Sequence, residues 1–365
     1  MQYDRDIGPA RMRAGLEPAY QFMIRVRLPG GISTPAQWVV MDELAQTRGN
    51  GTLKLTTRQA YQLHGVVKKE LKATVRAFNA ALMDSLAACG DVNRNAMLGS
   101  SAPDDGVYHE TLRCVQSVSD HLTPRSGAYH EVWLDKKKVG GGAPIEEEPI
   151  YGRTYLPRKF KIAFAIPPNN DVDVLAHDLG FVAITETVPE GEFGEAGVLE
   201  APRIAGSGAG SAAAVPSSSS FVTESKESDG ESDVPGVKYA RPPTHRERLV
   251  GFTVTVGGGM GSTHGNTATF PRLAEALCFC PPDEVNELSE AIVTVQRDFG
   301  DRVNRKHARM KYTIDDRGLA WFKGEVERRL GRRLLPPRPV EFDSTTDQYG
   351  WRAGTDGLYH VLLWV

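Results

Sequence analysis

The chain has 365 residues, 40% of them hydrophobic and 24% charged, which is enough for two or three domains with a sizeable core. A formal net charge of -3 argues against a protein coated with positive charge for nucleic acid, and no apolar run approaches the roughly 18 residues of a membrane span. Four cysteines are too few for a disulfide scaffold and the N-terminus lacks the apolar segment of a signal peptide, so we expect a cytoplasmic protein.

Residues 1–100 predict an N-terminal arm followed by strand, helix, two strands and helix. The segment Tyr20 to Leu28 alternates apolar and polar residues, as a strand does. A helix follows, capped by Ser33 or Thr34, and a second helix is expected from about Lys69 to Ala88. The expected core residues of the second helix are Leu71, Val75, Phe78 and Leu82. This order predicts an α+β half-domain of ferredoxin-like type, with helices on one face of an antiparallel sheet.

The segment Gly51 to Gly65 separates apolar from basic side chains, because neighbouring residues of a strand point to opposite faces. One set is Leu53, Leu55, Tyr61 and Leu63. The other set is Lys54, Thr56, Arg58, Ala60, Gln62 and His64. We expect the first set to be buried under the helices and the second set to share the opposite face with Arg25 and Arg27. An ordinary solvated sheet face is the alternative.

Further short basic clusters are scattered along the chain. They contain Arg94, then Arg153, Arg158, Lys159 and Lys161, then Arg297, Arg302, Arg305, Lys306, Arg309 and Lys311. Because the overall charge is close to zero, these cations suit one local polyanion better than a long one.

Residues 105–335 predict a second α+β domain. Its expected helices are one near Tyr108 to His121 and others after Pro271, Pro282 and Asp315. Its expected strands are Gly127 to Leu134, Lys159 to Ile166, Val182 to Val188 and Leu249 to Val256. Residues 190–247 are rich in Gly, Ser, Ala and acidic residues, so we expect them to form a disordered surface insertion.

Two further features have less specific interpretations. The run VGGGMGSTHGN, starting at Val256, matches neither phosphate-binding glycine fingerprint. It is either a backbone nest near a carboxylate-bearing cofactor or a structural turn. The spacing of Cys278 and Cys280 is tighter than the usual metal-binding pair, so we expect no metal site and interpret all four cysteines as buried or half-buried thiols.

Six motifs taken in series resemble one family. RVRLPGG, LTTRQAYQLHG, GDVNRN, YLPRKFK, VGGGM and NRKHARMKYT follow each other in the siroheme-dependent sulfite and nitrite reductases, and most resemble the assimilatory sulfite reductase hemoproteins. The resemblance runs from Asp4 to Val365 except across the insertion. It implies that residues 105–335 form the siroheme-binding domain and that residues 336–365 begin a second ferredoxin-like half-domain.

The resemblance also implies a purpose for the basic face, because siroheme is rich in carboxylates that Arg and Lys bind well. The residues implied at the substrate, on the distal side of the siroheme iron, are Arg25, Arg94, Lys159 and Lys161. The residues implied around the macrocycle are Lys54, Arg58, Gln62, His64, Arg302, Arg305 and Arg309. For each of them, a solvent-facing side chain is the alternative.

The implied reaction is the six-electron reduction of sulfite to sulfide in sulfur assimilation, with electrons from an NADPH-oxidising flavoprotein or from ferredoxin. Lys161 favours sulfite, because nitrite reductases of the family commonly have asparagine there. Nitrite reduction on the same scaffold, or a non-catalytic protein that binds a tetrapyrrole or an anion, is the alternative.

The chain departs from the family pattern in its cysteines. Family members carry four cysteines in a later half that ligate a [4Fe-4S] cluster, and none of the cysteines here is expected at those positions. We therefore interpret the chain as a truncated or split form that needs a cluster-bearing half. The family also has several dozen further residues at the start, so a plastid transit peptide is possible.

Overall fold

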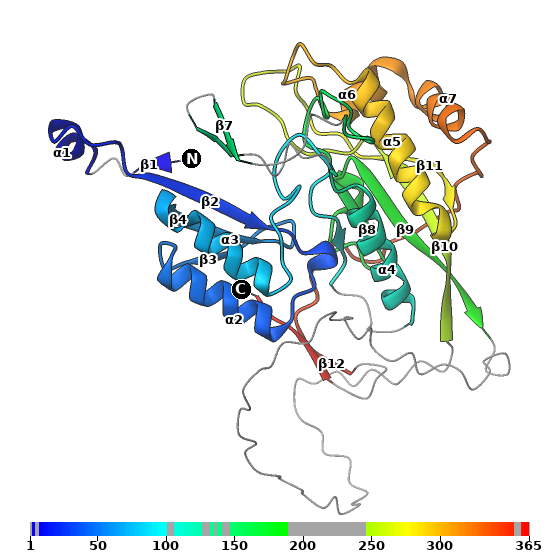
Figure 1. Cartoon of the computed structure of the whole chain (residues 1–365). Coiled ribbons are helices and arrows are strands. Elements are labelled where there is room, and N and C mark those ends of the chain that lie inside the picture. The colour runs from blue at the N-terminus through cyan, green and yellow to red at the C-terminus, as the bar shows by residue number, and fades with distance from the viewer. Residues whose placement is uncertain are drawn as a thin grey trace, which may run out of the picture.

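The computed structural model describes residues 2–3, 7–100, 106–125, 132–134, 137–140, 147–188, 246–353 and 359–364 (Figure 1). The insertion expected at 190–247 lies outside the described residues, apart from its last two, which belong to a strand. Among the described helices, none combines the length and apolar character that crossing a bilayer requires.

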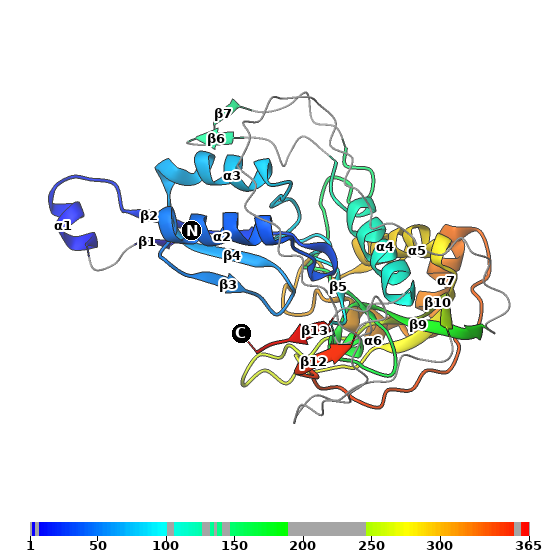
Figure 2. The same ribbon diagram turned by 90° about the horizontal axis from the view of Figure 1, so that it is seen from below.

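The N-terminal part is the expected α+β half-domain, with an antiparallel sheet covered on one face by two helices (Figure 2). The strand order is β1-β2-β4-β3. The core between sheet and helices includes Val26, Met41, Leu63 and Phe78. The elements are β1 (Gln2–Tyr3), α1 (Gly8–Arg13), β2 (Tyr20–Val26), α2 (Pro35–Thr47), β3 (Leu53–Leu55), β4 (Tyr61–Val67) and α3 (Leu71–Ala80).

Helix α2 begins as the sequence predicts, and α3 ends earlier than expected. Thr34 and Gln37 form a reciprocal capping box at the start of α2. The chain leaves α3 through Leu82, whose φ of 60° is left-handed, while the Met83 amide donates to the Phe78 carbonyl at 3.0 Å. The expected core position of Leu82 is therefore wrong, because this side chain is 72% exposed and Met83 is buried in its place.

The segment Gly51 to Gly65 forms two strands, so the alternation of a single strand holds only within each of them. A turn separates β3 from β4, with Gln59 at a φ of 52°. Arg58 therefore lies in the turn, and Ala60 is buried although it was expected on the basic face. The expected burial of Leu55 is wrong, because it ends the edge strand β3 and is 45% exposed.

The second part contains a five-stranded mixed sheet with the order β11-β10-β9-β8-β5. β5, β8 and β9 are parallel, and β10 is antiparallel to both of its neighbours. Phe164, Phe181 and Phe252 pack together in the core on the face covered by α4 and α5 (Figure 1). The elements are β5 (Met97–Leu98), α4 (Gly106–His121), β6 (Val132–Leu134), β7 (Lys137–Gly140), β8 (Ile162–Ala165), β9 (Leu179–Val188), β10 (Arg246–Val256), β11 (Glu275–Cys280), α5 (Val285–Phe299), α6 (Met310–Arg317) and α7 (Leu319–Leu330).

The helix expected after Pro271 is wrong, because this segment forms strand β11. The apolar run that ends at Cys280 is buried and pairs antiparallel with β10, so it has the pattern of a central strand. Cys114, Cys278 and Cys280 are buried, as expected, whereas Cys89 is exposed. Most of the strand expected at Gly127 to Leu134 lies outside the described residues; its last three residues form β6.

The two parts are joined by specific side chains. Buried Asn95 donates to the carbonyls of Leu28 at 2.7 Å and Arg58 at 2.8 Å, and its own carbonyl accepts from the Leu28 amide at 3.0 Å. Arg27, expected on the open basic face, instead bonds to Thr123 at 2.7 Å just beyond α4. The half-domain is therefore fixed against the start of β5 and the end of α4.

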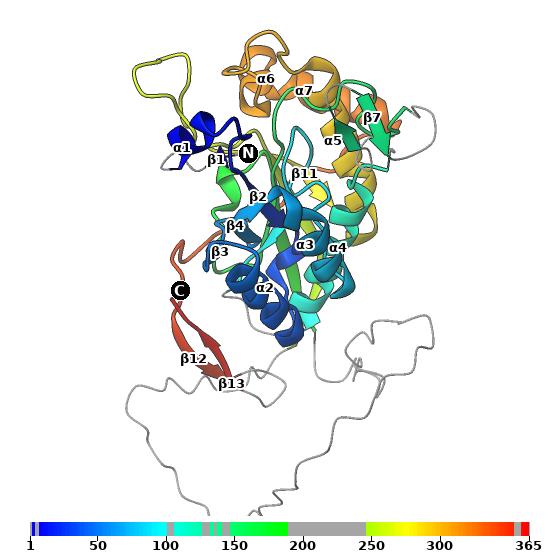
Figure 3. The same cartoon turned by 60° about the vertical axis from the view of Figure 1, so that its left-hand side comes forward.

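A hairpin of β12 (Gly350–Ala353) and β13 (Tyr359–Leu362) follows and projects from the edge of the second part (Figure 1, Figure 3). Its Trp351 side chain is exposed. The domain limits at 100, 105 and 335 stay predictions, as does the assignment of this hairpin to a second ferredoxin-like half-domain.

Candidate anion and cofactor site

A row of polar side chains crosses the half-domain sheet. Register places Arg25 and Lys54 directly opposite Gln62, on its two sides. Gln62 Oε1 accepts from Arg25 Nε at 3.0 Å and from Nη2 at 2.6 Å, and its amide nitrogen lies 2.5 Å from His64 Nε2. Burial, Lys54 and Arg25 lower the pKa of His64, so its neutral ring nitrogen accepts this bond at pH 7. These four expected residues therefore lie together.

A second group lies where two parallel strands begin. Lys161 and Asp178 directly precede the register pair formed by Ile162 and Leu179, and the Leu179 amide donates to the Lys161 carbonyl at 3.1 Å. The Asp178 side chain is 1% exposed, and its Oδ1 accepts from Arg309 Nε at 2.9 Å and Nη2 at 2.8 Å. Its Oδ2 is buried without a hydrogen-bond partner among the described residues.

Arg58 links the sheet row to the strand starts. Its Nη2 donates to the carbonyls of Asn95 at 2.6 Å and Ile162 at 3.0 Å, while its buried Nε has no partner in the described part of the chain. Burial lowers the pKa of Arg58 to about 10; Asp178 opposes this shift, and the positive charges of Arg94, Arg309 and Arg25 add to it. Arg58 is thus surrounded by the same cations that the sequence motifs single out.

Lys159 and Lys161 have side chains that form no hydrogen bond or ion pair with any residue the structure describes. Burial lowers the pKa of both lysines, that of Lys161 to about 8. Arg309 also lowers the pKa of Lys161, whereas Asp178 raises it. Two half-buried ammonium groups therefore keep all their protons available to a ligand.

Arg94 completes the group beside Arg25. Its Nε donates to the Gly90 carbonyl at 3.0 Å, and Arg25 Nη1 donates to Cys89 Sγ at 3.2 Å. Burial lowers the pKa of Arg94; Cys89 opposes this shift, and the charge of Arg25 adds to it. The structure therefore gathers one cation cluster, which consists of Arg25, Arg58, Arg94, Lys159, Lys161 and Arg309.

Arg302 and Arg305, both expected as cofactor contacts, belong neither to the sheet row nor to the cation cluster. Arg302 donates to the carbonyls of Thr154 at 3.2 Å and Tyr155 at 2.5 Å, so it holds a loop. Arg305 is 60% exposed and pairs with Asp91 at 2.9 Å, at the rim near Arg94. The sequence alone does not show whether an arginine at either position holds a loop or binds a ligand.

The glycine run is a structural turn, so the backbone nest that the sequence left open is wrong. The amides of Gly257 and Gly258 donate to the carbonyls of Asp178 at 2.9 Å and His177 at 2.8 Å, so neither is available to an anion. A Cβ at Gly258 would collide with backbone carbonyl oxygens, including that of His177. Only glycine allows this close approach, which fixes the backbone of the residues before β9.

Sequence reasoning missed His177 and Asp178. His177 is buried, its Nδ1 donates to the Asp173 carbonyl at 2.9 Å, and burial next to Arg58 lowers its pKa to about 3, so the ring is neutral. The available signal was a polar pair directly before an apolar strand. It could not be used, because the expected strand began at Val182 rather than at Leu179.

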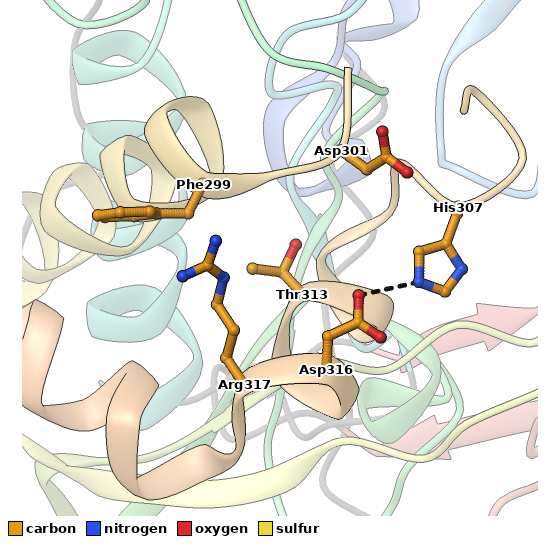
Figure 4. Close-up of a pocket in the computed structure, with 6 residues that line it drawn as sticks. All are labelled: Phe299, Asp301, His307, Thr313, Asp316 and Arg317. Atoms are coloured by element: carbon orange, nitrogen blue, oxygen red, sulfur yellow. Dashed lines mark hydrogen bonds and ion pairs between the residues drawn. The ribbon is translucent and has the colours of Figure 1, made fainter. Parts of the chain in front are cut away.

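A separate cavity of about 450 Å³ lies beside α6 (Figure 4). His307 Nε2 and Asp316 Oδ2 are paired there at 2.9 Å, and the Arg317 guanidinium lies 5.1 Å from the centre of the Phe299 ring. No expected site residue lines this cavity. Its lining residues are Phe299, Asp301, His307, Thr313, Asp316 and Arg317.

The residues present fit one implied cofactor and not the other. Arg58 Nε and the ammonium groups of Lys159 and Lys161, which have no partner among the described residues, fit a carboxylate-rich macrocycle with a small anion. The buried cysteines do not fit an iron–sulfur cluster, because burial raises the pKa of Cys114 to about 11 and of Cys278 to about 12. No group of three ligating side chains that could hold a metal occurs among the described residues.

Comparison with known proteins identifies the family of the chain. Residues 116–334 match the family described as nitrite and sulphite reductase 4Fe-4S domain, and residues 15–81 match the nitrite/sulfite reductase ferredoxin-like half domain. The chain is 48% identical to the sulfite reductase [NADPH] hemoprotein beta-component of Geobacillus kaustophilus (strain HTA426), over 100% of this chain and 54% of that protein. It is 46% identical to the protein of the same name from Myxococcus xanthus (strain DK1622), over 99% and 53%.

A solved structure of the Mycobacterium tuberculosis NirA protein has the same fold, with a TM-score of 0.60 at 21% identity, over 94% of this chain and 46% of that one. The chain spans about half the length of the curated relatives it matches. The family match, the half-domain match and the identity over its full length together show that the chain belongs to the nitrite and sulphite reductase family.

Proposed function

We propose that this chain is the substrate-binding and siroheme-binding portion of a cytoplasmic sulfite reductase hemoprotein. The observation that carries the proposal is the cation cluster, in which Lys159 and Lys161 have no partner in the described part of the chain. A carboxylate-rich cofactor and a sulfite anion would supply the missing negative charge. The names of the relatives favour sulfite as the substrate.

The substrate side of the site consists of Arg25, Arg94, Lys159 and Lys161. When bound, siroheme would supply the redox-active iron for the reduction of sulfite. The arginines contribute fixed positive charge that orients the anion and offsets the charge that builds up on it. The lysines hold protons at Nζ for the oxygens that leave as water; Lys161, with a pKa of about 8, is charged at pH 7 and still releases a proton readily.

The cofactor side consists of Lys54, Arg58, Gln62, His64 and Arg309, whose polar groups would bind the carboxylates of the macrocycle. Gln62 keeps Arg25 in position, since both guanidinium donors on that side reach its oxygen. We leave Arg302 and Arg305 out of the proposed contacts because they bond to loop carbonyls and to Asp91, outside the sheet row and the cation cluster.

Electrons are proposed to come from an NADPH-oxidising flavoprotein, which the names of the relatives favour over ferredoxin. The thiols described here do not fit an iron–sulfur cluster, so turnover is proposed to require a cluster-bearing half supplied with this chain. Without that half, the chain would bind siroheme and anions and would not turn over.

The proposal is tested by producing the full chain alone, and joined to the remaining half of the Geobacillus kaustophilus relative, in cells that make siroheme. We expect siroheme absorption and sulfide formation in the joined protein, with electrons from reduced methyl viologen. The same joined protein with Lys161→Met is the control for background sulfide. The absence of tetrapyrrole absorption from both forms would contradict the proposal, and nitrite reduction without sulfite reduction would reassign the substrate.

A further inference from the structure

The proposed function assigns no role to Asp178, although this carboxylate interacts with four of the six cations in the cluster. Its charge acts on Arg58, Lys159 and Lys161, in each case opposing the loss of a proton, and it pairs directly with Arg309. These side chains come from four places in the chain: the turn after β3, the start of β8, the start of β9 and the residue before α6.

The backbone fixes where this carboxylate points relative to Lys161. In parallel strands, paired residues direct their side chains to the same face. Lys161 and Asp178 each precede a member of the register pair Ile162 and Leu179, and the Leu179 amide bonds to the Lys161 carbonyl at 3.1 Å. The Asp178 carbonyl is also held, by the Gly257 amide at 2.9 Å. The two side chains therefore start from neighbouring, anchored positions.

The two oxygens of Asp178 have different surroundings. Oδ1 accepts both bonds from Arg309, at 2.9 and 2.8 Å, whereas Oδ2 is buried and has no partner in the described part of the chain. A buried acceptor without a donor is costly, so it is kept only where something uses it. Lys161 is the neighbour with free protons, on a flexible stem that can swing toward Oδ2 or toward a bound anion.

We propose that Asp178 is a positioning residue that holds Arg309 with one oxygen and, with the other, keeps Lys161 protonated until an anion binds. This inference deepens the proposed function, because it explains how a lysine crowded by cations stays charged. The groups that face Lys161 are Arg309, Arg58, Lys159 and neutral His177, besides Asp178. Without the carboxylate, the three cations would act on Lys161 unopposed and drive it toward the neutral amine.

The test is a pH titration of Lys161 in the full chain, without cofactor. Lysine amines are dimethylated with ¹³C-formaldehyde, and the signal absent from a Lys161→Arg variant is followed by NMR between pH 6 and pH 11. Asp178→Asn is expected to lower the Lys161 midpoint by about one pH unit or more. The control is Asp173→Asn, the same chemical change at an exposed residue, which is expected to shift it by less than about 0.3 unit.

A second pair of variants keeps the proposal testable if Asp178→Asn alone does not fold, since Arg309 then loses its counter-charge. Arg309→Gln removes the buried cation, and Arg309→Gln combined with Asp178→Asn replaces the whole ion pair by two amides. The double variant is expected to have the lower Lys161 midpoint of the two. Equal midpoints, or an unchanged midpoint in Asp178→Asn, would overturn the proposal.

Anion binding gives a readout that a merely structural role would not produce. Sulfate is the probe, because its charge is constant between pH 6 and pH 9. By calorimetry, Asp178→Asn is expected to weaken sulfate binding at pH 8 by about fivefold or more and to approach the unmodified chain at pH 6, where Lys161 is largely protonated in both. An equal loss at both pH values would also overturn the proposal. If the midpoint shifts but the joined protein reduces no sulfite, the inference stands and the proposed function falls.

Discussion

Lys161 and Lys311 both lie in the second part of the molecule, but their ammonium groups differ in their hydrogen-bond partners. Lys311 lies in the first turn of α6, is 1% exposed, and donates to the carbonyls of Gly259 and Gly261 at 2.9 Å and to that of Phe270. Lys161 lies at the start of β8 with no partner in the described part of the chain. A lysine whose protons meet backbone carbonyls holds the fold, whereas one with free protons is available to a ligand.

The arginines show the same contrast. Arg302 uses its terminal nitrogens on loop carbonyls, while Arg58 keeps a buried Nε without a partner beside the cations that face the proposed ligand. The resemblance implied a cofactor contact for both arginines, so the surroundings rather than the sequence distinguish the two roles.

The largest effect is expected from Lys161→Met. This change should lower the rate of sulfide formation by the joined protein by about 100-fold or more, because a positive group and a proton donor are lost from the substrate side. Its urea denaturation midpoint should not fall, since the Lys161 ammonium makes no bond that the fold needs. Lys161→Arg is the matched variant that restores charge but not easy proton release. Loss of siroheme absorption in Lys161→Met would contradict its place on the substrate side.

The reverse is expected for Lys311→Met. The free energy of unfolding should fall by about 3 kcal/mol, because several buried carbonyls lose a charged donor. Urea denaturation of the full chain measures it, with the exposed Lys306→Met as control from the same segment. If Lys311→Met instead kept its stability and lost sulfate binding, the contrast between the two lysines would be broken.

A smaller effect is expected when sulfate binding and stability are measured as a function of pH. Lys161 has a pKa of about 8, below its ordinary 10.5, so sulfate binding should weaken by up to about tenfold per pH unit above 8. The stability of the chain without a bound anion should change with pH in the opposite direction. Between pH 8 and 10.5 the unfolded lysine binds a proton that the folded one lacks, so the contribution of Lys161 to stability rises with pH.

Replacing Lys161 by arginine should flatten both trends, because arginine stays charged to higher pH than lysine. Calorimetry for sulfate and urea denaturation for stability, at matched pH values, measure the two directions. If both quantities changed in the same direction, Lys161 would not be the titrating group.

The smallest effect is expected from Arg305→Gln. Its guanidinium is 60% exposed and its bond to Asp91 is open to solvent, so sulfate binding and siroheme content should each change by less than about twofold. Absorption of the joined protein and calorimetry of the chain measure these quantities. A marked loss of siroheme would return Arg305 to the cofactor contacts, where the resemblance first placed it.

The sequence predicted those parts that depend on local pattern. The cap at Thr34 and the core position of Phe78 follow from residue types and spacing. The grouping of Arg25, Arg94 and Lys161 was expected only from the resemblance to a known family. The end of α3 could not be predicted, because a left-handed Leu82 has no sequence signature of its own.

The position of Asp178 was also beyond the sequence, since it depends on which residues of two distant strands are paired. The same holds for the glycine run, whose amides are used by carbonyls that only the folded chain brings near. Long-range pairing, rather than propensity, decides both.

The contacts of Asn95 matter for the design of chimeras between this protein and its relatives. The side-chain amide of Asn95 binds Leu28 and Arg58 of the half-domain, whereas its own backbone belongs to the following part. The position of Arg58 in the cation cluster therefore depends on the contact between the two parts. A chimera that exchanges the first ninety or so residues with those of another relative inherits a sound sheet and helices. The chimera keeps the arrangement of the cation cluster only if the exchanged segment offers the Asn95 amide the same backbone carbonyls.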